Sequence, residues 1–501
     1  MGVVKTQRAR VESCALRGVQ TIAVTVEIEV GAGLPGMHIV GMADSSVQEA
    51  RHRVKSAVRA AGFEMESNRH IVVNLAPASV RKSGAGFDLP IALAYLIATK
   101  QIAPSIADGF VAVGELSLEG FVCPVDGLFA YAMYAQQHRF ALLCGQPHME
   151  LPQLEGVELM CIDGLSDLKF GRFSKPHAVR AHHRPEPPDF RDVVGQEHAI
   201  RAMCIAAAGG HGLLMTGPPG SGKSMLARRL PSILPPLSES EQVQTALIHS
   251  VAGLDVSGIT AGQRPFRAPH HSATTASLVG GGTPLRPGEA SLAHNGVLFL
   301  DELGEFSSST LQALRQPLED GEVSLCRADG RAVFPAKFQL IAASNPCPCG
   351  YLGDREHACK CTDLQIDRYR GKLGGPVRDR IDLCCEVSRI DPAKVLRSGS
   401  GADSAQLSSL VLAARERADK RGDDRGALAT LPPHSVIEAC GLSNAQQRLV
   451  EEAARKHCLS GRGIVRTLRV ARTIADLEQS DAVADEHLLE ALTFRVEGGL
   501  Q

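Results

Sequence analysis

Apolar and polar positions follow three different patterns along the 501-residue chain, and the first covers roughly residues 1–172. Residues alternate in polarity over 23–30, which predicts a half-buried strand. Over 45–61 the apolar residues recur at helical spacing, and Ser45 with Gln48 forms a capping box that predicts where this helix begins. Further strands are predicted over 71–75 and 141–144, a hairpin over 114–120, and helices over 88–98 and 126–137.

The second pattern consists of three short apolar runs, each with the length of a buried parallel strand. They span 213–215, 297–300 and 338–343, and segments with helical spacing lie over 197–208 and 225–230. Strands that alternate with helices in this way predict a parallel sheet covered by helices.

The third pattern is purely helical and begins near residue 395. Helices are predicted over 405–420, 443–457, 462–477 and 485–492. The third of these carries arginines three or four residues apart, which predicts a stripe along one side of the helix: Arg462, Arg466, Arg469 and Arg472.

The patterns together predict four parts of the chain. Residues 173–189 have no periodicity and carry several prolines, as is typical of a linker. We therefore expect an α/β domain over 1–172, this linker, a second α/β domain over 190–394 and a helical domain over 395–501.

The first apolar run of the second domain leads directly into a glycine-rich loop that fits phosphate binding. The motif G-x-x-x-x-G-K-[ST] is matched by Gly217, Pro218, Pro219, Gly220, Ser221, Gly222, Lys223 and Ser224. Glycines let successive backbone N–H groups turn toward an anion, and the helix that follows presents its positive end. We expect Lys223 to reach the β- and γ-phosphates of ATP and Ser224 to ligate Mg²⁺.

Acidic and amide side chains end the other two apolar runs. We expect Asp301 to hold Mg²⁺ and Glu302 to activate a water molecule as general base, and Asn345 is placed to position that water. This set resembles the AAA+ ATPases, in which Asn345 matches the sensor 1 position. In the same resemblance, Val193 and Val194 match the apolar segment that covers the adenine base.

The balance of charge argues against a surface that is basic overall. The chain has 53 Lys and Arg against 55 Asp and Glu, a net charge of −2, so a nucleic-acid site must be a local patch or the lining of a pore. No run of 18 apolar residues predicts a membrane helix, and no signal peptide is evident, so we expect a cytoplasmic protein.

Four of the 14 cysteines lie within a short segment after Asn345. In a chain without an export signal, clustered cysteines favour reduced thiols or a metal over disulfides. Two C-x-C pairs separated by a glycine turn suit a tetrahedral structural zinc site, made of Cys347, Cys349, Cys359 and Cys361. The alternative is a cysteine-rich loop without metal.

The segment 262–288 is polar, rich in glycine and locally basic. It carries Arg264, Arg267, His270, His271 and Arg286. We expect a flexible loop that contacts a nucleic-acid phosphate backbone inside a ring. The alternative is a surface loop that packs on a neighbouring subunit.

Two arginines are candidates for contact with the γ-phosphate. The stretch GPVRDRIDL resembles the part of magnesium-chelatase-type subunits that carries an Asp-Arg pair, which makes Arg380 the candidate arginine finger, acting on the neighbouring subunit. Arg378 and Arg368 are rivals, and a structural salt bridge is the alternative role. Arg462, which follows Ser-Gly, resembles sensor 2.

The first domain resembles the Lon-type protease domain, because a glycine stretch, GELSLEG and PVDGL follow in the same order. That family uses a Ser-Lys dyad, whose positions fall here on Gly86 and Phe129. Neither residue can act as nucleophile or base. Ser83 and Lys82 lie nearby but are interpreted as loop residues, so we expect a Lon-like fold without proteolytic chemistry.

The resemblance that covers nearly the whole chain is to the magnesium-chelatase-like AAA+ ATPases, a family that includes bacterial competence proteins. It is carried by GPPGSGKS, HNGVLFLDEL, SNPCPCG, GPVRDRIDL and SGRGIVRTLRVARTIADL. The resemblance implies a hexameric ring that hydrolyses ATP with Mg²⁺ and drives branch migration of DNA as a helicase during natural transformation and recombination. The alternatives are a magnesium-chelatase motor that remodels a protein partner, and an ATP-dependent protease.

Overall fold

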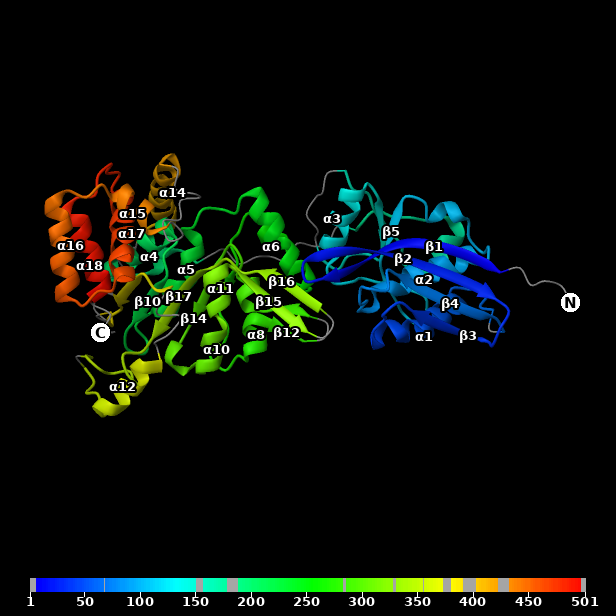
Figure 1. Cartoon of the computed structure of the whole chain (residues 1–501), viewed down its shortest axis with the longest axis horizontal. Helices are drawn as coiled ribbons and strands as arrows, with labels where there is room; N and C mark the ends of the chain where they lie inside the picture. Colours follow the sequence, from blue (N-terminus) through cyan, green and yellow to red (C-terminus); the bar gives the residue numbers. More distant parts are fainter. Residues whose placement is uncertain are drawn as a thin grey trace.

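The computed structural model describes residues 6–66, 68–149, 156–177, 188–282, 285–327, 330–354, 356–372, 380–390, 402–421 and 432–496. The molecule is elongated, with an α/β domain at the N-terminal end, a second α/β domain in the middle and helices at the C-terminal end (Figure 1). Most of the expected linker, 178–187, lies outside the described residues. Within the described ranges, no helix combines the length and apolar character needed to cross a bilayer.

The N-terminal domain is built on a seven-stranded mixed sheet with the order β3-β4-β2-β1-β5-β8-β9. Its strands are β1 (Gln7–Arg17), β2 (Gln20–Gly31), β3 (Gly36–Val40), β4 (His70–Ala76), β5 (Phe110–Ala112), β8 (Ala141–Cys144) and β9 (Leu159–Cys161). The predicted hairpin is β6 (Glu115–Leu116) with β7 (Val122–Cys123). Strand β1, which the sequence pattern did not indicate, pairs with β2 along its whole length.

Helices cover both faces of this sheet. Helices α1 (Ser45–Ala60) and α2 (Asp88–Ala98) share a core with one face, and α3 (Leu128–His138) packs on the other. The predicted capping box at Ser45 is wrong. The N-cap is Asp44, whose carboxylate accepts the Val47 N–H at 2.9 Å, which makes Ser45 the first helical residue.

The middle domain contains the predicted parallel sheet, with the order β11-β14-β17-β10-β18. The strands are β10 (Leu213–Thr216), β11 (Phe266–Arg267), β14 (Val297–Leu300), β17 (Gln339–Ser344) and β18 (Leu383–Glu386). Leu213 and Met215 face the core that includes α4 (Glu197–Gly209) and α5 (Lys223–Arg229), whereas Leu214 faces a second core on the opposite side.

Several elements lie between the phosphate loop and β14. They are α6 (Glu239–Val251), α7 (Ser257–Thr260), α8 (Thr275–Val279), β12 (Gly280–Gly281), β13 (Arg286–Pro287) and α9 (Glu289–Leu292). The segment 262–288 therefore contains a helix and paired strands as well as loops, which the expectation of a flexible loop did not include. After β14 follow η6 (Leu303–Glu305), α10 (Ser308–Ala313), α11 (Arg315–Asp320) and a hairpin of β15 (Glu322–Arg327) and β16 (Gly330–Pro335).

The C-terminal helices are α14 (Ser404–Lys420), α15 (Pro433–Cys440), α16 (Asn444–Lys456), α17 (Gly461–Leu477) and α18 (Asp485–Val496). They share one apolar core with α4 and with the parallel sheet. Arg472 departs from the predicted stripe, because its side chain is buried and donates to Asp476 and to the carbonyls of Ser480 and Asp481. It is a structural residue.

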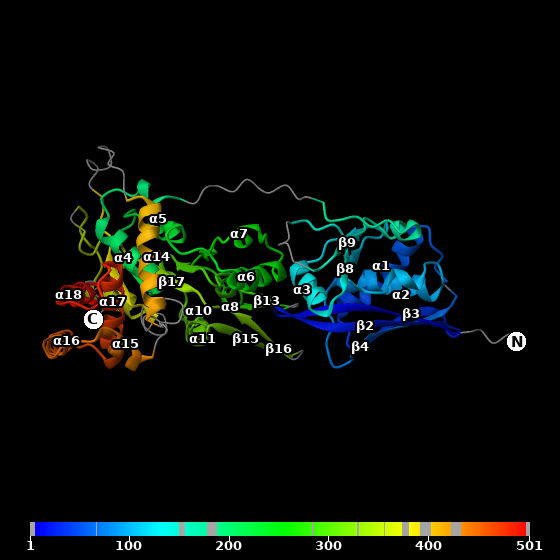
Figure 2. The ribbon, with the colours of Figure 1, turned by 90° about the horizontal axis from the view of Figure 1, so that it is seen from above.

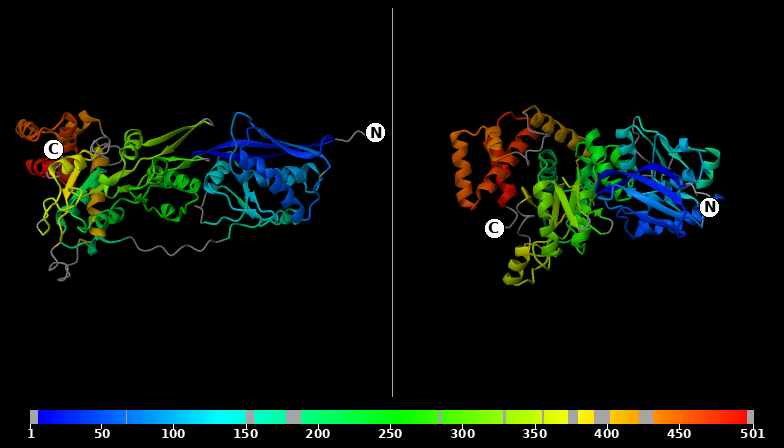
Figure 3. Two further views of the ribbon diagram at one scale, coloured as in Figure 1. Left: turned by 90° about the horizontal axis from the view of Figure 1, so that it is seen from below. Right: turned by 45° about the vertical axis from the view of Figure 1, so that its right-hand side comes forward.

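The two α/β domains contact each other through α3 and α6, which lie close together in the views of Figures 1 and 2. The Gly127 N–H donates to the Ser250 carbonyl at 2.8 Å. Phe129 is 1 % exposed and forms an apolar cluster with residues of the middle domain: Leu237, Ala246, Val256 and Ile259. At the turn between β1 and β2, Gly18 lies against the backbone of Val333 in β16 (Figure 3).

Candidate nucleotide-binding site

The register of the parallel sheet brings the three predicted motifs to one edge. Thr216, the last residue of β10, lies opposite Ser344 of β17, and Leu300 of β14 lies opposite Ala342. The phosphate loop, Asp301 and Asn345 follow these strand ends directly. They therefore meet at the carboxyl edge of the sheet, where open α/β sheets bind their ligands.

The phosphate loop needs its glycines for two reasons. Gly220 and Gly222 have φ angles of 76° and 94°, a region that side chains rarely allow. A Cβ on Gly217 would stand 2.1 Å from the Val387 carbonyl oxygen, so this position also requires glycine. Space is open around Gly220, where an added Cβ would meet no atom within 4 Å. The loop therefore packs closely against protein at Gly217 and leaves open space at Gly220, as a phosphate-binding loop requires.

Lys223 is held at the base of this loop. Its Nζ donates to the carbonyls of Gly217 at 2.7 Å and Pro218 at 2.9 Å, and it lies 3.3 Å from Oδ1 of Asn345. Burial lowers the pKa of Lys223, while the nearby charges of Asp301 and Glu302 act to raise it. The loop lysine and the side chain of Asn345, expected to be sensor 1, are therefore in contact.

Ser224 and Asp301, the two residues expected to ligate Mg²⁺, lie side by side. The Ser224 hydroxyl donates to Asp301 Oδ2 at 2.5 Å, which places two oxygen donors suited to Mg²⁺ side by side. In the loop itself, the Ser221 hydroxyl is buried and has no hydrogen-bond partner among the described residues. A buried donor of this kind is costly without a ligand, so the described residues fit a bound phosphate with its metal ion.

Glu302 has a strained backbone and an unexpected partner. Its φ is 51°, uncommon for a residue with a side chain, and its N–H donates to Asp301 Oδ1 at 3.0 Å. Its carboxylate lies 3.0 Å from Nδ1 of His271, which comes from the segment 262–288. This contact was not predicted from the sequence. The His270–His271 pair in that segment is the feature that could have indicated it.

An apolar cavity of about 470 Å³ lies beside α4, where the adenine base was expected. Its lining includes Val193, Val194, Gly195, Gln196, Ile200, Cys204, Leu407 and Leu477. Gln196 connects this cavity to the phosphate loop, because its Nε2 donates to the Ser221 carbonyl at 3.2 Å. Val193 and Val194, which were expected to cover the adenine base, thus line an apolar cavity next to the phosphate loop.

Arg380 and Arg462 lie in one surface groove of about 740 Å³. The groove is basic, since five arginines line it against one glutamate: Arg315, Arg380, Arg462, Arg466, Arg469 and Glu319. One of these arginines, Arg466, also lies 3.7 Å from Asp382. No residue of the phosphate loop lines it. The structure therefore groups the two arginines with each other rather than with the phosphate loop of their own chain. The rival Arg378 lies outside the described residues.

The arginines of 262–288 do not project freely as a basic loop. Arg264 contacts Glu241 at 3.2 Å, Arg267 binds both oxygens of Glu289, and Arg286 lies 3.3 Å from Asp126 of the N-terminal domain. These ion pairs correct the expectation that all three are presented to a phosphate backbone.

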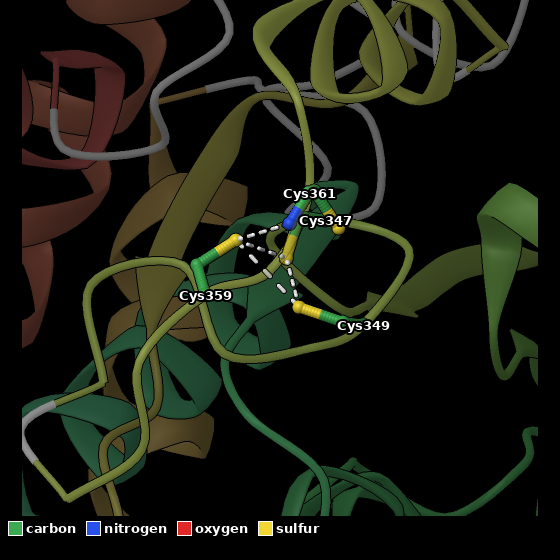
Figure 4. Close-up of side chains that lie close together, drawn as sticks. All are labelled: Cys347, Cys349, Cys359 and Cys361. Atoms are coloured by element: carbon green, nitrogen blue, oxygen red, sulfur yellow. Dashed lines mark hydrogen bonds between the residues drawn. The ribbon is translucent and has the colours of Figure 1, made fainter.

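The four clustered cysteines come together as predicted (Figure 4). Their sulfur atoms all lie within 4.8 Å of one another, a group that could hold a metal ion. The N–H groups of Lys360 and Tyr351 lower the pKa of the Cys349 thiol to about 6, which favours the thiolate.

In the N-terminal domain, the positions of a Lon-type dyad carry no catalytic group. A Cβ built on Gly86 would lie 3.9 Å from Val125 and Tyr131, so the two segments that resemble the dyad segments are neighbours. Phe129 instead belongs to the contact with the middle domain. Lys82 is buried and donates to the carbonyls of Gly41 at 3.1 Å and Leu75 at 2.8 Å, and also to that of Pro77.

Three family models match the chain. Residues 189–395 match the model for magnesium chelatase, subunit ChlI; residues 26–145 match subunit ChlI of Mg-chelatase; and residues 401–495 match the ChlI C-terminal model. The matches cover parts of all three structural regions and agree with the mixed α/β fold described above.

Comparison with curated proteins gives full-length relatives. The chain is 40% identical over 495 residues to the uncharacterized protein YifB of Salmonella typhimurium, and 40% identical over 500 residues to the competence protein ComM of Haemophilus influenzae. Each match covers 97% of both chains. A weaker match, 27% identical over 238 residues, is to Lon protease 2 of Bacillus subtilis and covers 42% of this chain and 43% of the relative. The chain therefore belongs to the magnesium-chelatase-like AAA+ family, together with YifB and ComM.

Proposed function

We propose that the protein is an ATPase that works with Mg²⁺ and turns ATP hydrolysis into work on DNA. The observation that carries the ATPase is the grouping of Lys223 with Asn345 and of Ser224 with Asp301 at one sheet edge. Lys223 and the loop N–H groups bind the phosphates, Ser224 and Asp301 hold the metal ion, and the apolar cavity beside Val193 takes the base.

Glu302 is the proposed general base. Its carboxylate is half-exposed and stands one residue beyond Asp301, within reach of a water molecule next to the phosphates. Asn345, in contact with Lys223, positions that water through its amide. In the structure the Glu302 carboxylate contacts Nδ1 of His271.

We propose a ring in which the nucleotide-binding site of each subunit is completed by arginines of the next subunit. The support is the basic groove with Arg380 and Arg462, which is lined by none of the chain's own phosphate-loop residues. A guanidinium that neutralises charge developing on a transferred phosphoryl group needs an anion to face, and the neighbouring subunit supplies one. A hexamer is the expected ring size.

DNA is the proposed substrate of the motor, as a helicase that migrates branched strands during transformation. The support is the full-length relative named as a competence protein. His270 and His271 remain partly or fully exposed in the segment 262–288, so they are candidates for contact with a strand. Because the arginines of that segment are paired, we expect a weak, local contact.

The alternatives differ in how well the observations support them. A motor subunit of a magnesium chelatase remains a candidate, because models named for subunit ChlI match both residues 189–395 and residues 26–145. An ATP-dependent protease is disfavoured by Gly86 and Phe129 at the dyad positions.

The test is to measure ATP hydrolysis by the purified full chain alone and with single-stranded, duplex and forked DNA of one length. The proposal predicts stimulation, strongest with one of the DNA forms, and separation of labelled strands from a branched junction. The variant His270→Ala, which leaves the contact between His271 and Glu302 in place, should lose part of the stimulation. ATP hydrolysis that no DNA form changes, with no strand separation, would support the protein-remodelling alternative instead.

A further inference from the structure

The cysteine cluster has the dimensions of a tetrahedral metal site. Sulfur–sulfur distances are 3.4 Å between Cys347 and Cys349, 3.7 Å between Cys347 and Cys359, and 3.6 Å between Cys349 and Cys359. Four sulfurs at about 2.3 Å from a zinc ion stand about 3.8 Å apart along the edges of a tetrahedron. Three of the sulfurs are thus close to that geometry, and the Cys361 sulfur lies within 4.8 Å of each of them.

The surroundings favour a structural site over a reactive one. Cys347 is buried and the other three are partly buried, so the cluster is largely shielded from solvent. Four thiolates fill all the positions that zinc takes in structural sites and leave none for a substrate. Sulfur ligands also select zinc over Mg²⁺ or Ca²⁺, which prefer oxygen.

The segment that carries the cysteines touches the phosphate loop. Cys347 stands two residues after Asn345, and the turn that follows places Gly350 against Pro219. A Cβ on Gly350 would lie 2.6 Å from Cδ of Pro219 and 3.9 Å from Cγ of Asn345. The first cysteine pair therefore sits on a turn packed between the phosphate loop and the sensor amide.

The second cysteine pair leads to the other side of the site. Cys361 is followed by α12 (Asp363–Lys372), whose Tyr369 is 5 % exposed. The Tyr369 hydroxyl lies 3.4 Å from that of Ser344, and its ring packs so closely on Gly304 that a Cβ there would stand 2.5 Å away. Gly304 is two residues beyond Glu302, so α12 supports the segment of the general base.

We infer that Cys347, Cys349, Cys359 and Cys361 bind one Zn²⁺, and that this ion fixes Asn345 and the Glu302 segment for ATP hydrolysis. The ion crosslinks the turn on the phosphate loop to the helix behind the base. The cysteines are positioning residues, because the zinc acts through Asn345, Pro219 and Tyr369 and not on the nucleotide. The second half of this inference rests on the proposed ATPase function.

A positioning role of the zinc ion predicts that loss of the metal slows ATP hydrolysis and leaves ATP binding unaffected. The adenine cavity and the Ser224–Asp301 pair have no contact with the cysteine segment among those described, and Lys223 keeps its two carbonyl partners without Asn345. ATP affinity should therefore stay nearly unchanged. Misplacement of a positioning amide or a general base by about 1 Å costs about tenfold to a hundredfold in rate. Loss of metal should therefore lower kcat by that factor and leave ATP binding nearly intact.

The first measurement is metal content, which requires no ATPase activity. Protein purified under reducing conditions without chelator should hold about one zinc per chain. Replacement with Co²⁺ should give the intense visible absorption of tetrahedral cobalt thiolate. The double variant Cys359→Ser with Cys361→Ser should lose both signals, whereas the control Cys326→Ser with Cys458→Ser, at two exposed cysteines outside the cluster, should keep them. Wild-type protein without zinc that also gives no cobalt thiolate spectrum would overturn the site.

The second measurement is the split between kcat and ATP affinity. Because the double variant could unfold, the same comparison is made on wild-type protein stripped of metal by mild chelation and then reloaded with Zn²⁺. The inference predicts that stripping lowers kcat, that reloading restores it, and that the dissociation constant of a fluorescent ATP analogue changes little. A zinc site whose removal leaves kcat unchanged, or abolishes ATP binding equally, would overturn the positioning role. If the zinc-loaded wild type hydrolyses no ATP at all, the proposed ATPase has failed, which the metal analysis reports separately.

Discussion

Each of the two α/β domains contains a buried lysine beside a glycine turn, and the two lysines differ in what surrounds them. Lys82 is fully buried, and its ammonium donates to three backbone carbonyls, those of Gly41, Leu75 and Pro77. Lys223 also donates to two carbonyls, but it is 8 % exposed and contacts Asn345.

The difference lies in the space and the partners left for a ligand. Around Lys223 stand an open glycine, a buried Ser221 hydroxyl without a partner among the described residues, and the Ser224–Asp301 pair. Around Lys82 the carbonyls complete the coordination of the ammonium. The surroundings of Lys223 therefore fit the ligand-binding role proposed for it, whereas those of Lys82 make that lysine a structural crosslink.

The largest expected effect concerns the groove that the active domain offers to its neighbour. Arg380→Ala should lower ATP hydrolysis about a thousandfold, because a missing arginine finger leaves transition-state charge unmatched. Arg380→Ala and Lys223→Ala chains, each nearly inactive alone, should regain activity when co-expressed, since some sites then combine an intact loop with an intact neighbour. Co-assembled rings of verified size that stay as inactive as either parent would argue against the cross-subunit role and turn attention to Arg368 and Arg378.

The next prediction concerns Phe129, which occupies a position of the Lon-type dyad and lies in the contact between the two α/β domains. Phe129→Ala removes a buried ring from the contact with α6 and should weaken the docking of the domains by about 3 kcal/mol. Calorimetry should then resolve two transitions where the wild type shows one. Phe170→Ala, at a position 66 % exposed, is the matched control and should change nothing. A single unchanged transition in the Phe129 variant would show that the contact contributes little.

The variant Lys82→Met tests whether Lys82 has a structural role and no role in hydrolysis. This change leaves three carbonyls without their donor and should destabilise the N-terminal domain by about 2 kcal/mol. Hydrolysis per folded molecule should stay within about twofold, because Lys82 lies in the other domain. Denaturant unfolding followed beside steady-state turnover separates the two effects. A specific loss of turnover at full stability would mean that the two domains are coupled through this turn.

The smallest expected effect concerns His271. Its contact with the half-exposed Glu302 carboxylate is worth about 1 kcal/mol, so His271→Ala should free the base and raise basal hydrolysis about fivefold. His270→Ala is the matched control, because the Nδ1 of His270 lies 2.8 Å from the Ser272 hydroxyl instead. A fall in turnover in the His271 variant would show that the histidine holds the base in its working position.

The sequence predicted the elements whose pattern is local. Strand β14 begins and ends at the predicted residues, Val297 and Leu300, and α14 and α17 each begin one residue early. The motifs at the strand ends lie together because parallel strands share one carboxyl edge. The proximity of Lys223, Asp301 and Asn345 could therefore be inferred without knowledge of long-range contacts.

Long-range contacts explain what the sequence missed. Arg472 has the spacing of a surface stripe and a local partner, Asp476, but α17 packs into a core shared with α4 and α14, and this burial cannot be read from helical periodicity. Arg267 and Arg286 look free in the sequence, and their partners Glu289 and Asp126 are brought to them only by folding and domain contact. The contact between His271 and Glu302 is likewise brought about only by folding.

The most direct test of the account separates ATP binding from ATP hydrolysis in two variants of the middle domain. Glu302→Gln keeps Lys223, Ser224 and Asp301, so it should bind ATP with an affinity within about threefold of the wild type while single-turnover hydrolysis falls about a hundredfold or more. Lys223→Ala should lose ATP binding, because the charge of the phosphates is unmatched. If both variants lose binding equally, or if the Glu302 variant hydrolyses ATP at the wild-type rate, the assignment of the catalytic site is contradicted.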